Sequence, residues 1–271
     1  CCEILGITNR KMKPMLTPEN IAAAHRSASS RSSSAPAASS SDDGSSNDSD
    51  YDSDNENGQL TLANYRTAVG MLGYAASACR PDVAHAYSMA ARQQQTPTPQ
   101  DLQAVIHAFR YLNGCASLSL RFTSDSIPPQ LTAYSDADWA GDAANARSTS
   151  GSIFKLGGAA VSWSCTKQQN VALSSTEAEY IAASETAREI AWIRVMLAEL
   201  GQAQPDPTPL RIDNTTAIRM ALEEGNQGRR KHINVKHHYI REQLTEKVIV
   251  LEWVPTSEQE ADIMTKAPSR P

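Results

Sequence analysis

The sequence predicts an α/β fold in which a mixed five-stranded sheet is flanked by helices and is preceded by a small helical module and a disordered linker. Three observations support this. Residues 27–58 are rich in Ser, Asp and Asn, residues 60–114 repeat apolar side chains at helical spacing, and from Pro129 the period changes to strand alternation. We therefore divide the chain into segments 1–26, 27–58, 59–128 and 129–271.

The first two segments contain little that can form a core. Segment 1–26 begins at Cys1, as a piece of a longer chain would, and has only a short apolar run before a proline. Segment 27–58 has almost no large apolar residue, so burial cannot offset its ordering entropy, and we expect it to be disordered. It carries seven acidic residues against Arg31, so the net charge of −5 becomes +1 without it, and global charge does not exclude a nucleic-acid partner.

Segment 59–128 predicts three helices. The first, over 61–79, repeats apolar residues from Leu62 to Ala76, the second has Pro81 in its first turn, and the third runs from Thr98 to Gly114. This pattern predicts helix packing and shows no chemistry of its own.

Segment 129–271 predicts a mixed sheet. In chain order, the expected strands are 130–136, 151–158, 159–167, 209–213 and 248–255, and the expected helices are 175–201, 214–225, 231–247 and 257–267. A turn at Gly157 and Gly158 joins the second and third strands, and Ser175 or Thr176 is the expected N-cap of the long helix. The apolar surroundings of Trp163, Trp192 and Trp253 place these side chains in the core.

Four carboxylates lie where this sheet would gather functional groups. Asp136 and Asp213 end two strands, Glu179 lies in the first turns of the long helix, and Asp262 lies in the helix after the last strand. If the first and fourth strands are neighbours, the four groups converge. Their mutual repulsion then requires cations, and oxygen ligands suit two Mg²⁺ ions, with Mn²⁺ as a substitute, which together can clamp the reacting oxygens of a phosphodiester.

Two neighbouring acids compete for these positions. Asp138 is two residues beyond Asp136, but Trp139 and the following Ala and Gly indicate that the strand is ending, which favours Asp136 as the ligand and Asp138 as a loop residue. Glu177 lies on a different helix face from Glu179 and fits a first-turn acid that complements the helix dipole.

These motifs resemble a known family. "YSDADWAGD", "ARSTSGS", "ALSSTEAEYIA", "IDNTTAI", "KHINVKHHYIRE" and "VPTSEQEADIMTKA" are similar to the ribonuclease H region of copia-like long-terminal-repeat retrotransposon polyproteins. Upstream, "YRTAVGMLGYAASACRPDVAHAYSMA" resembles the stretch that joins reverse transcriptase to ribonuclease H in that family, and "LGITNRKMKPMLTP" resembles the tail of the polymerase thumb.

The resemblance implies a ribonuclease H-like fold and a Mg²⁺-dependent endoribonuclease that cuts the RNA strand of an RNA/DNA hybrid. It implies that Asp136, Glu179, Asp213 and Asp262 are the ligands of two metal ions, and that the remainder of the reverse transcriptase is a partner. The polymerase motif YxDD of the family is missing, so we expect no polymerase activity. No histidine lies between Trp253 and Asp262, where many cellular ribonucleases H have one to help product release.

Small polar and basic residues near the carboxylates are candidates for substrate binding. Ser175, Thr176, Asn214 and Thr215 flank the acids, although helix capping would also account for Ser175 and Asn214. The basic run "GRRKHINVKHH" favours phosphate binding by Arg230, Lys231 and Lys236 over a merely solvated face, and ligand spacing does not favour zinc.

The remaining expectations concern location and competing functions. Five cysteines without a CxxC pair fit a reducing compartment, and no apolar run approaches the ~20 residues of a membrane span, so we expect no membrane partner and an intracellular location, in cytoplasmic virus-like particles or in the nucleus. An integrase-like DNA strand-transfer core is the competing enzyme class, and an inactive nucleic-acid-binding remnant is the non-enzyme alternative. The position of Glu179 on the first helix and the presence of a fourth acid favour the ribonuclease.

Overall fold

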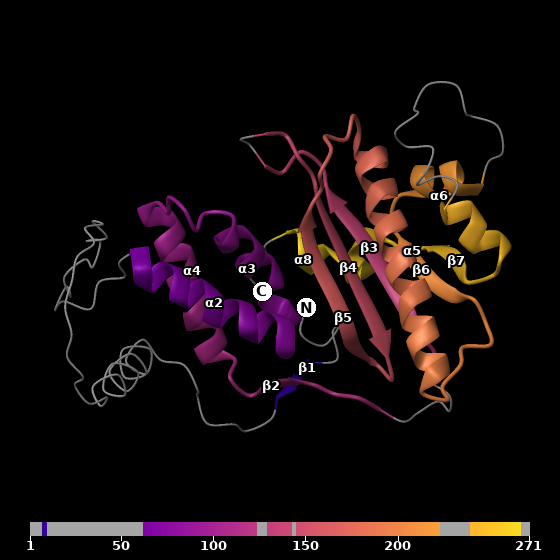
Figure 1. The fold of residues 1–271 in the computed structure, drawn as a ribbon, viewed down its shortest axis with the longest axis horizontal. Coiled ribbons are helices and arrows are strands. Elements are labelled where there is room, and N and C mark those ends of the chain that lie inside the picture. Colours follow the sequence, from indigo (N-terminus) through magenta and orange to yellow (C-terminus); the bar gives the residue numbers. More distant parts are fainter. Residues whose placement is uncertain (1–6, 10–61, 124–128, 143–144, 223–238, 267–271) are drawn as a thin grey trace, which may run out of the picture.

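A computed structural model describes residues 7–9, 62–123, 129–142, 145–222 and 239–266. A twisted sheet lies between two helical layers, with the helical module on one side and the long helix α5 on the other (Figure 1). The expected linker 27–58 lies outside the described residues, and so does the first part of the expected helix 231–247, residues 231–238.

The helical module consists of α2 (Leu62–Ala78), a 3-10 turn at Pro81–Val83, α3 (Ala84–Ala91) and α4 (Pro99–Gly114). Thr98 caps α4 through a capping box with Asp101, which satisfies free backbone N–H groups at the helix start. The three expected helices are therefore confirmed.

The sheet has the five strands that the sequence predicted, although the bounds of β3 and β4 are each displaced by two residues from the expected ones. Its strands are β3 (Thr132–Asp138), β4 (Thr149–Leu156), β5 (Ala159–Lys167), β6 (Thr208–Ile212) and β7 (Ile249–Trp253). The spatial order is β5-β4-β3-β6-β7, with antiparallel pairing from β3 through β5 and parallel pairing from β3 through β7. Gly157 and Gly158 have φ angles of 59° and 82°, a backbone conformation that glycine adopts easily in the turn between β4 and β5. The expected mixed five-stranded sheet is confirmed.

One face of the sheet is covered by α5 (Ser175–Glu199), with α6 (Thr215–Leu222) beside it. Ala133 and Phe154 of the sheet share an apolar cluster with Ala187, Ile190 and other side chains of α5. Residues 239–245 are also helical. This layer fixes α5 along the sheet, and it thereby fixes Glu179, which lies in the first turns of α5.

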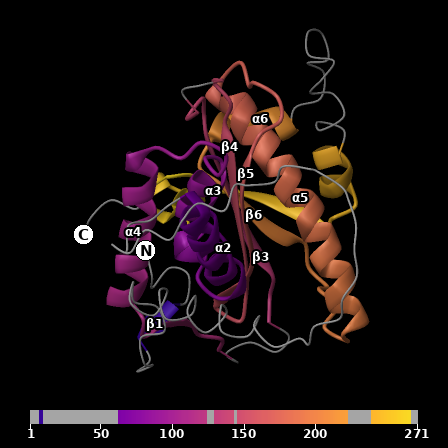
Figure 2. The ribbon, with the colours of Figure 1, turned by 60° about the vertical axis from the view of Figure 1, so that its left-hand side comes forward.

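The helical module and α8 (Asp262–Thr265) cover the other face (Figure 2). Ile153 of β4 and Met264 of α8 belong to the same buried cluster as Tyr65 and Val69 of α2. Polar contacts join the layers too, because the indole Nε1 of Trp163 donates to the carbonyl of Ala76 over 2.7 Å. The module thus shares one hydrophobic core with the sheet.

A small second sheet pairs residues from segment 1–26 with residues that follow α4. Strand β1 (Ile7–Asn9) pairs antiparallel with β2 (Leu118–Leu120). Residues 7–9 are the only part of segment 1–26 that the structure describes.

Several expectations are wrong in detail. The N-cap of α5 is Ser174, not Ser175 or Thr176, because Ser174 keeps an extended backbone and its hydroxyl accepts the N–H of Glu177. Trp192 and Trp253 are exposed by 58% and 56%, so they are not core residues. Among the described helices, none combines the length and apolar character needed to cross a membrane.

Candidate active site

Three aspartates meet at the carboxyl ends of β3 and β6. Asp136 lies near the end of β3, and Asp213 directly follows β6. The two strands are parallel neighbours, with Ala133 opposite Leu210, so their ends reach the same edge of the sheet. Asp262, the first residue of α8, completes the group, and one carboxylate oxygen from each aspartate lies within 4.8 Å of the others.

Glu179 approaches Asp136 from the first turns of α5. The helix starts after Ser174, which places Glu179 on the side that faces the end of β3. Its side chain is buried, and Oε2 has no hydrogen-bond partner among the described residues. Burial, followed by the negative charges of Asp136 and Asp213, raises the pKa of Glu179 to about 9. A buried carboxylate with an open oxygen is a group that a bound cation would stabilise.

Asp136 is the central carboxylate and is only 2% exposed. Burial raises its pKa to about 6, and the charges of Asp262 and Asp213 act in the same direction. A hydrogen bond from Thr265 and the positive charge of Lys266 act in the opposite direction. Removal from water therefore outweighs these two contacts, and the acid is destabilised in its ionised form.

Lys266 brings positive charge into the acidic group. Its Nζ lies 2.8 Å from Oδ1 of Asp262 and 3.7 Å from Oδ2 of Asp136. These carboxylates raise the pKa of Lys266 even though burial alone would lower it. The ammonium group thus compensates part of the negative charge of the two acids.

The segment before α8 is tied to the sheet by two polar contacts. Nε2 of Gln259 donates to the carbonyl of Ser135 over 2.9 Å, and Nζ of Lys155 lies 2.8 Å from Oε1 of Glu260. Both contacts are at least partly buried. They fix the position at which Asp262 enters the site.

The two competing acids lie elsewhere. Asp138 remains in β3, where it is paired with Thr149. The expectation that the strand ends at Asp136 is therefore wrong. The turn begins only after Asp138, and Ala140 in this turn has a φ angle of 54°. Asp138 is not in the group of three aspartates. Glu177 accepts the backbone N–H of Leu173 over 3.0 Å and so stabilises the start of α5.

The predicted substrate-binding residues fall into two sets. Ser175 and Thr176 form the first turn of α5, which also carries Glu179, and Thr215 starts α6 directly after Asp213 and Asn214. The side chain of Asn214 accepts two backbone N–H groups of that first turn, so it caps α6. Outside the described residues lie Arg230, Lys231 and Lys236.

Sequence reasoning missed Thr265 and Lys266, which both contact Asp136. They follow Asp262 by three and four residues, a spacing that places side chains on one face of a helix. That spacing is present in the sequence and would have indicated them. Sequence reasoning also missed Gln168. Its Nε2 donates hydrogen bonds to the hydroxyl of Ser150 and to the carbonyl of Ala178, and no local pattern indicates these two contacts.

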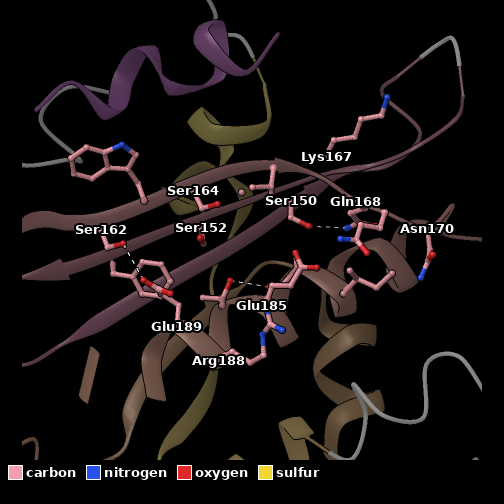
Figure 3. A pocket seen from close by; sticks show the side chains of 18 residues that line it. Ser150, Ser152, Ser162, Ser164, Lys167, Gln168, Asn170, Glu185, Arg188 and Glu189 are labelled. Atoms are coloured by element: carbon pink, nitrogen blue, oxygen red, sulfur yellow. Dashed lines mark hydrogen bonds between the residues drawn. The ribbon is translucent and has the colours of Figure 1, made fainter. Parts of the chain in front are cut away.

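A hollow of about 640 Å³ lies between β4, β5 and α5 (Figure 3). Serine side chains, including Ser150 and Ser162, line its strand wall, and Glu185, Arg188 and Glu189 come from the helix. None of the four predicted metal-binding acids lines it. The chemistry of the carboxylates therefore belongs to the sheet edge and not to this hollow.

Comparison with known proteins identifies relatives of this chain. It is 39% identical over 215 residues to the retrovirus-related Pol polyprotein from transposon TNT 1-94 of Nicotiana tabacum, which covers 79% of this chain and 16% of that protein. It is also 39% identical over 206 residues to the retrovirus-related Pol polyprotein from transposon RE1 of Arabidopsis thaliana, covering 76% and 14%. The chain thus spans about one sixth of the length of these relatives.

One solved structure is similar to part of this chain. LC11-RNase H1 in complex with an RNA/DNA hybrid matches with a TM-score of 0.38 and 14% identity, over 50% of this chain and 93% of that chain. No family model matches the sequence.

Proposed function

This chain belongs to the retrovirus-related Pol polyproteins of transposons, and we propose that it is a metal-dependent endoribonuclease that cleaves the RNA strand of RNA/DNA hybrids during reverse transcription. The observation that carries the proposal is the carboxylate group at the end of β3. Asp136, Asp213 and Asp262 bring oxygens within 4.8 Å of one another, beside the open Oε2 of Glu179.

The donor set fits divalent cations. All four side chains offer oxygen, which Mg²⁺ and Mn²⁺ accept readily, and the raised pKa values of Asp136 and Glu179 reflect buried acids that lack sufficient positive charge. The ammonium group of Lys266 contacts two of the four acids, Asp136 and Asp262. We infer that two divalent ions supply the missing charge, held by Asp136, Glu179, Asp213 and Asp262.

The chain itself provides orientation and charge. Two such ions, when bound, would polarise the scissile phosphate and activate the attacking water. Asp136 is fixed by Thr265, and Asp213 accepts a hydrogen bond from Thr256 over 3.0 Å, so these ligands are held before any cation enters. Lys266 at the rim of the site can pair with a substrate phosphate when cations replace it beside the acids.

The substrate would lie over the first turns of α5 and α6. Ser175, Thr176, Asn214 and Thr215 present short polar groups there, suited to the 2′-hydroxyls and phosphates of a hybrid. Arg230, Lys231 and Lys236 would add phosphate contacts that offset repulsion by the acids. The remainder of the reverse transcriptase is the expected partner, inside the cell that carries the transposon.

A cleavage assay with the purified chain tests this proposal. Labelled RNA/DNA hybrid, single-stranded RNA and duplex DNA are incubated with Mg²⁺, Mn²⁺ or EDTA, and only the RNA of the hybrid should be cut, only with a divalent ion. Glu179→Gln should abolish cleavage, whereas Glu246→Gln, a change at an exposed acid, should not. Hybrid binding without cleavage by the wild type would instead favour an inactive remnant, and cleavage or joining of duplex DNA would favour an integrase-like core.

A further inference from the structure

The C-terminal helix α8 packs unusually closely on the sheet at Gly151. This glycine lies opposite Asp136 in the pairing of β3 and β4. A Cβ atom at position 151 would lie 2.7 Å from Cβ of Met264 and 2.7 Å from Cγ2 of Thr265. Both distances are shorter than real contacts allow, so α8 can occupy its place only because residue 151 has no side chain.

The close approach brings Thr265 to Asp136. Thr265 is 2% exposed, and its hydroxyl donates a hydrogen bond to Oδ2 of Asp136. The same hydroxyl oxygen lies 3.2 Å from the carbonyl of Asp262 in the preceding turn of α8. One hydroxyl thus touches two of the three clustered aspartates, through the carboxylate of one and the backbone of the other.

We propose that Thr265 is a positioning residue for the cation site, which fixes the rotation of the Asp136 carboxylate, and that Gly151 permits this contact. The inference rests on the proposed function, because it assigns a role in a cation-dependent site. Asp136 is buried, and its Oδ2 accepts the hydroxyl of Thr265, the last residue of α8, and is approached by Lys266, which directly follows α8. The carboxylate is therefore oriented before the cation binds.

The expected effect follows from how metal ligands are supported. A hydrogen bond to a ligating carboxylate sets its orientation, and loss of such a partner typically weakens metal affinity by about 10- to 100-fold. Because the hydroxyl is buried, a bound hybrid would not reach it, and hybrid affinity should be unaffected. Loss of Thr265 should therefore change the Mg²⁺ requirement and kcat at limiting Mg²⁺, but not KM for the hybrid.

Two substitutions separate the hydroxyl from the methyl group. Thr265→Val keeps the shape and the Cγ2 contact at Gly151 but removes the hydroxyl, whereas Thr265→Ser keeps the hydroxyl and removes the methyl group. Thr186→Val is the matched control, because Thr186 is also 2% exposed and its hydroxyl donates to the carbonyl of Ala182 within α5. Mg²⁺ titrations of the melting temperature and of hybrid cleavage are the measurements.

We expect Thr265→Val to raise the Mg²⁺ midpoint of both titrations by about 10- to 100-fold, and Thr265→Ser and Thr186→Val to remain within a few-fold of the wild type. A wild-type midpoint for Thr265→Val overturns the inference. An equal loss in Thr265→Ser also overturns it, because packing of the methyl group would then be responsible. If the wild type itself shows no Mg²⁺ response, the proposed function fails, which is a different result.

Gly151→Ala tests the same contact from the sheet side if Thr265→Val does not fold. The added Cβ must displace α8 while the hydroxyl is retained, so the Mg²⁺ midpoint should rise as it does for Thr265→Val. Gly70→Ala is the control, since a Cβ at Gly70 meets nothing within 4 Å. A normal Mg²⁺ midpoint in a folded Gly151→Ala protein overturns the inference. The inference also fails if Gly151→Ala and Thr265→Val both fail to fold while Thr265→Ser folds normally, because the contact would then serve stability.

Discussion

Replacing Asp136 by Asn should stabilise the metal-free protein at pH 8. In the folded protein the pKa of Asp136 is raised from 3.8 to about 6, so its ionisation is costlier there than in the unfolded chain. The difference corresponds to about 3 kcal/mol of unfolding free energy at ~1.4 kcal/mol per pKa unit. For a domain of this size that is a rise in melting temperature of about 6–12 °C.

The pH dependence of this gain has a definite direction. Well below pH 3.8 the carboxyl group is protonated in both states, so wild type and Asp136→Asn should differ least there. Between about pH 4 and pH 6 the unfolded chain ionises first, and the wild type loses stability relative to the variant. Well above pH 6 both states are ionised, and the full difference should be present and constant.

Melting curves followed by circular dichroism, in EDTA at pH 4 and pH 8 and then with Mg²⁺, measure both parts of the effect. Mg²⁺ at a hundredfold excess over its dissociation constant should stabilise the wild type by about 2.7 kcal/mol and Asp136→Asn by much less. Glu246→Gln, at an exposed position, controls for loss of one carboxylate. If Asp136→Asn melts no higher than wild type in EDTA at pH 8, and the wild type is indifferent to millimolar Mg²⁺, these acids do not form a cation site.

Three further predictions address the site, the linker and the module. Asp262→Asn should abolish cleavage while hybrid affinity stays within a few-fold, because phosphate contacts supply most of the binding; unchanged cleavage would remove Asp262 from the site. Deletion of residues 27–58 should leave the melting temperature and the cleavage rate of the remainder intact, and a large loss of either would show that the segment contributes to the fold. Arg80→Met leaves Asp82 as a buried acid without its 2.7 Å ion pair, so urea unfolding should show a free energy of unfolding lower by about 3–5 kcal/mol. An additional Asp82→Asn change should restore part of this free energy, and no restoration would contradict the ion-pair explanation.

The sheet and the meeting of the acids follow from local pattern plus topology. Alternation identified the strands, and parallel pairing of β3 with β6 brings Asp136 and Asp213 to one edge, as expected if these two strands are neighbours. The approach of α8 did not follow in this way. Gly151 is one glycine within an alternating strand, and only the packed structure shows that its missing side chain makes room for Thr265.

The tryptophans show why apolar surroundings are a weak guide to burial. Trp192 lies on α5, a helix whose apolar residues extend around much of its circumference, so periodicity does not identify the buried face. Ile190 and Ile193 take the buried positions, and Trp192 is turned to the surface. Trp253 ends the edge strand β7, where its indole N–H donates to the carbonyl of Asp213 over 3.1 Å and its ring stays exposed.

The helical module, which by sequence shows no chemistry, packs against α8, the helix that carries Asp262. Ile263 and Met264 of α8 lie in the same buried cluster as Tyr65, Val69 and Phe109 of the module. These apolar contacts hold α8 from one side while the space at Gly151 admits it from the other. Asp262 and the hydroxyl of Thr265 are therefore positioned by residues more than 150 positions upstream, which explains why local sequence patterns do not predict how α8 approaches the sheet.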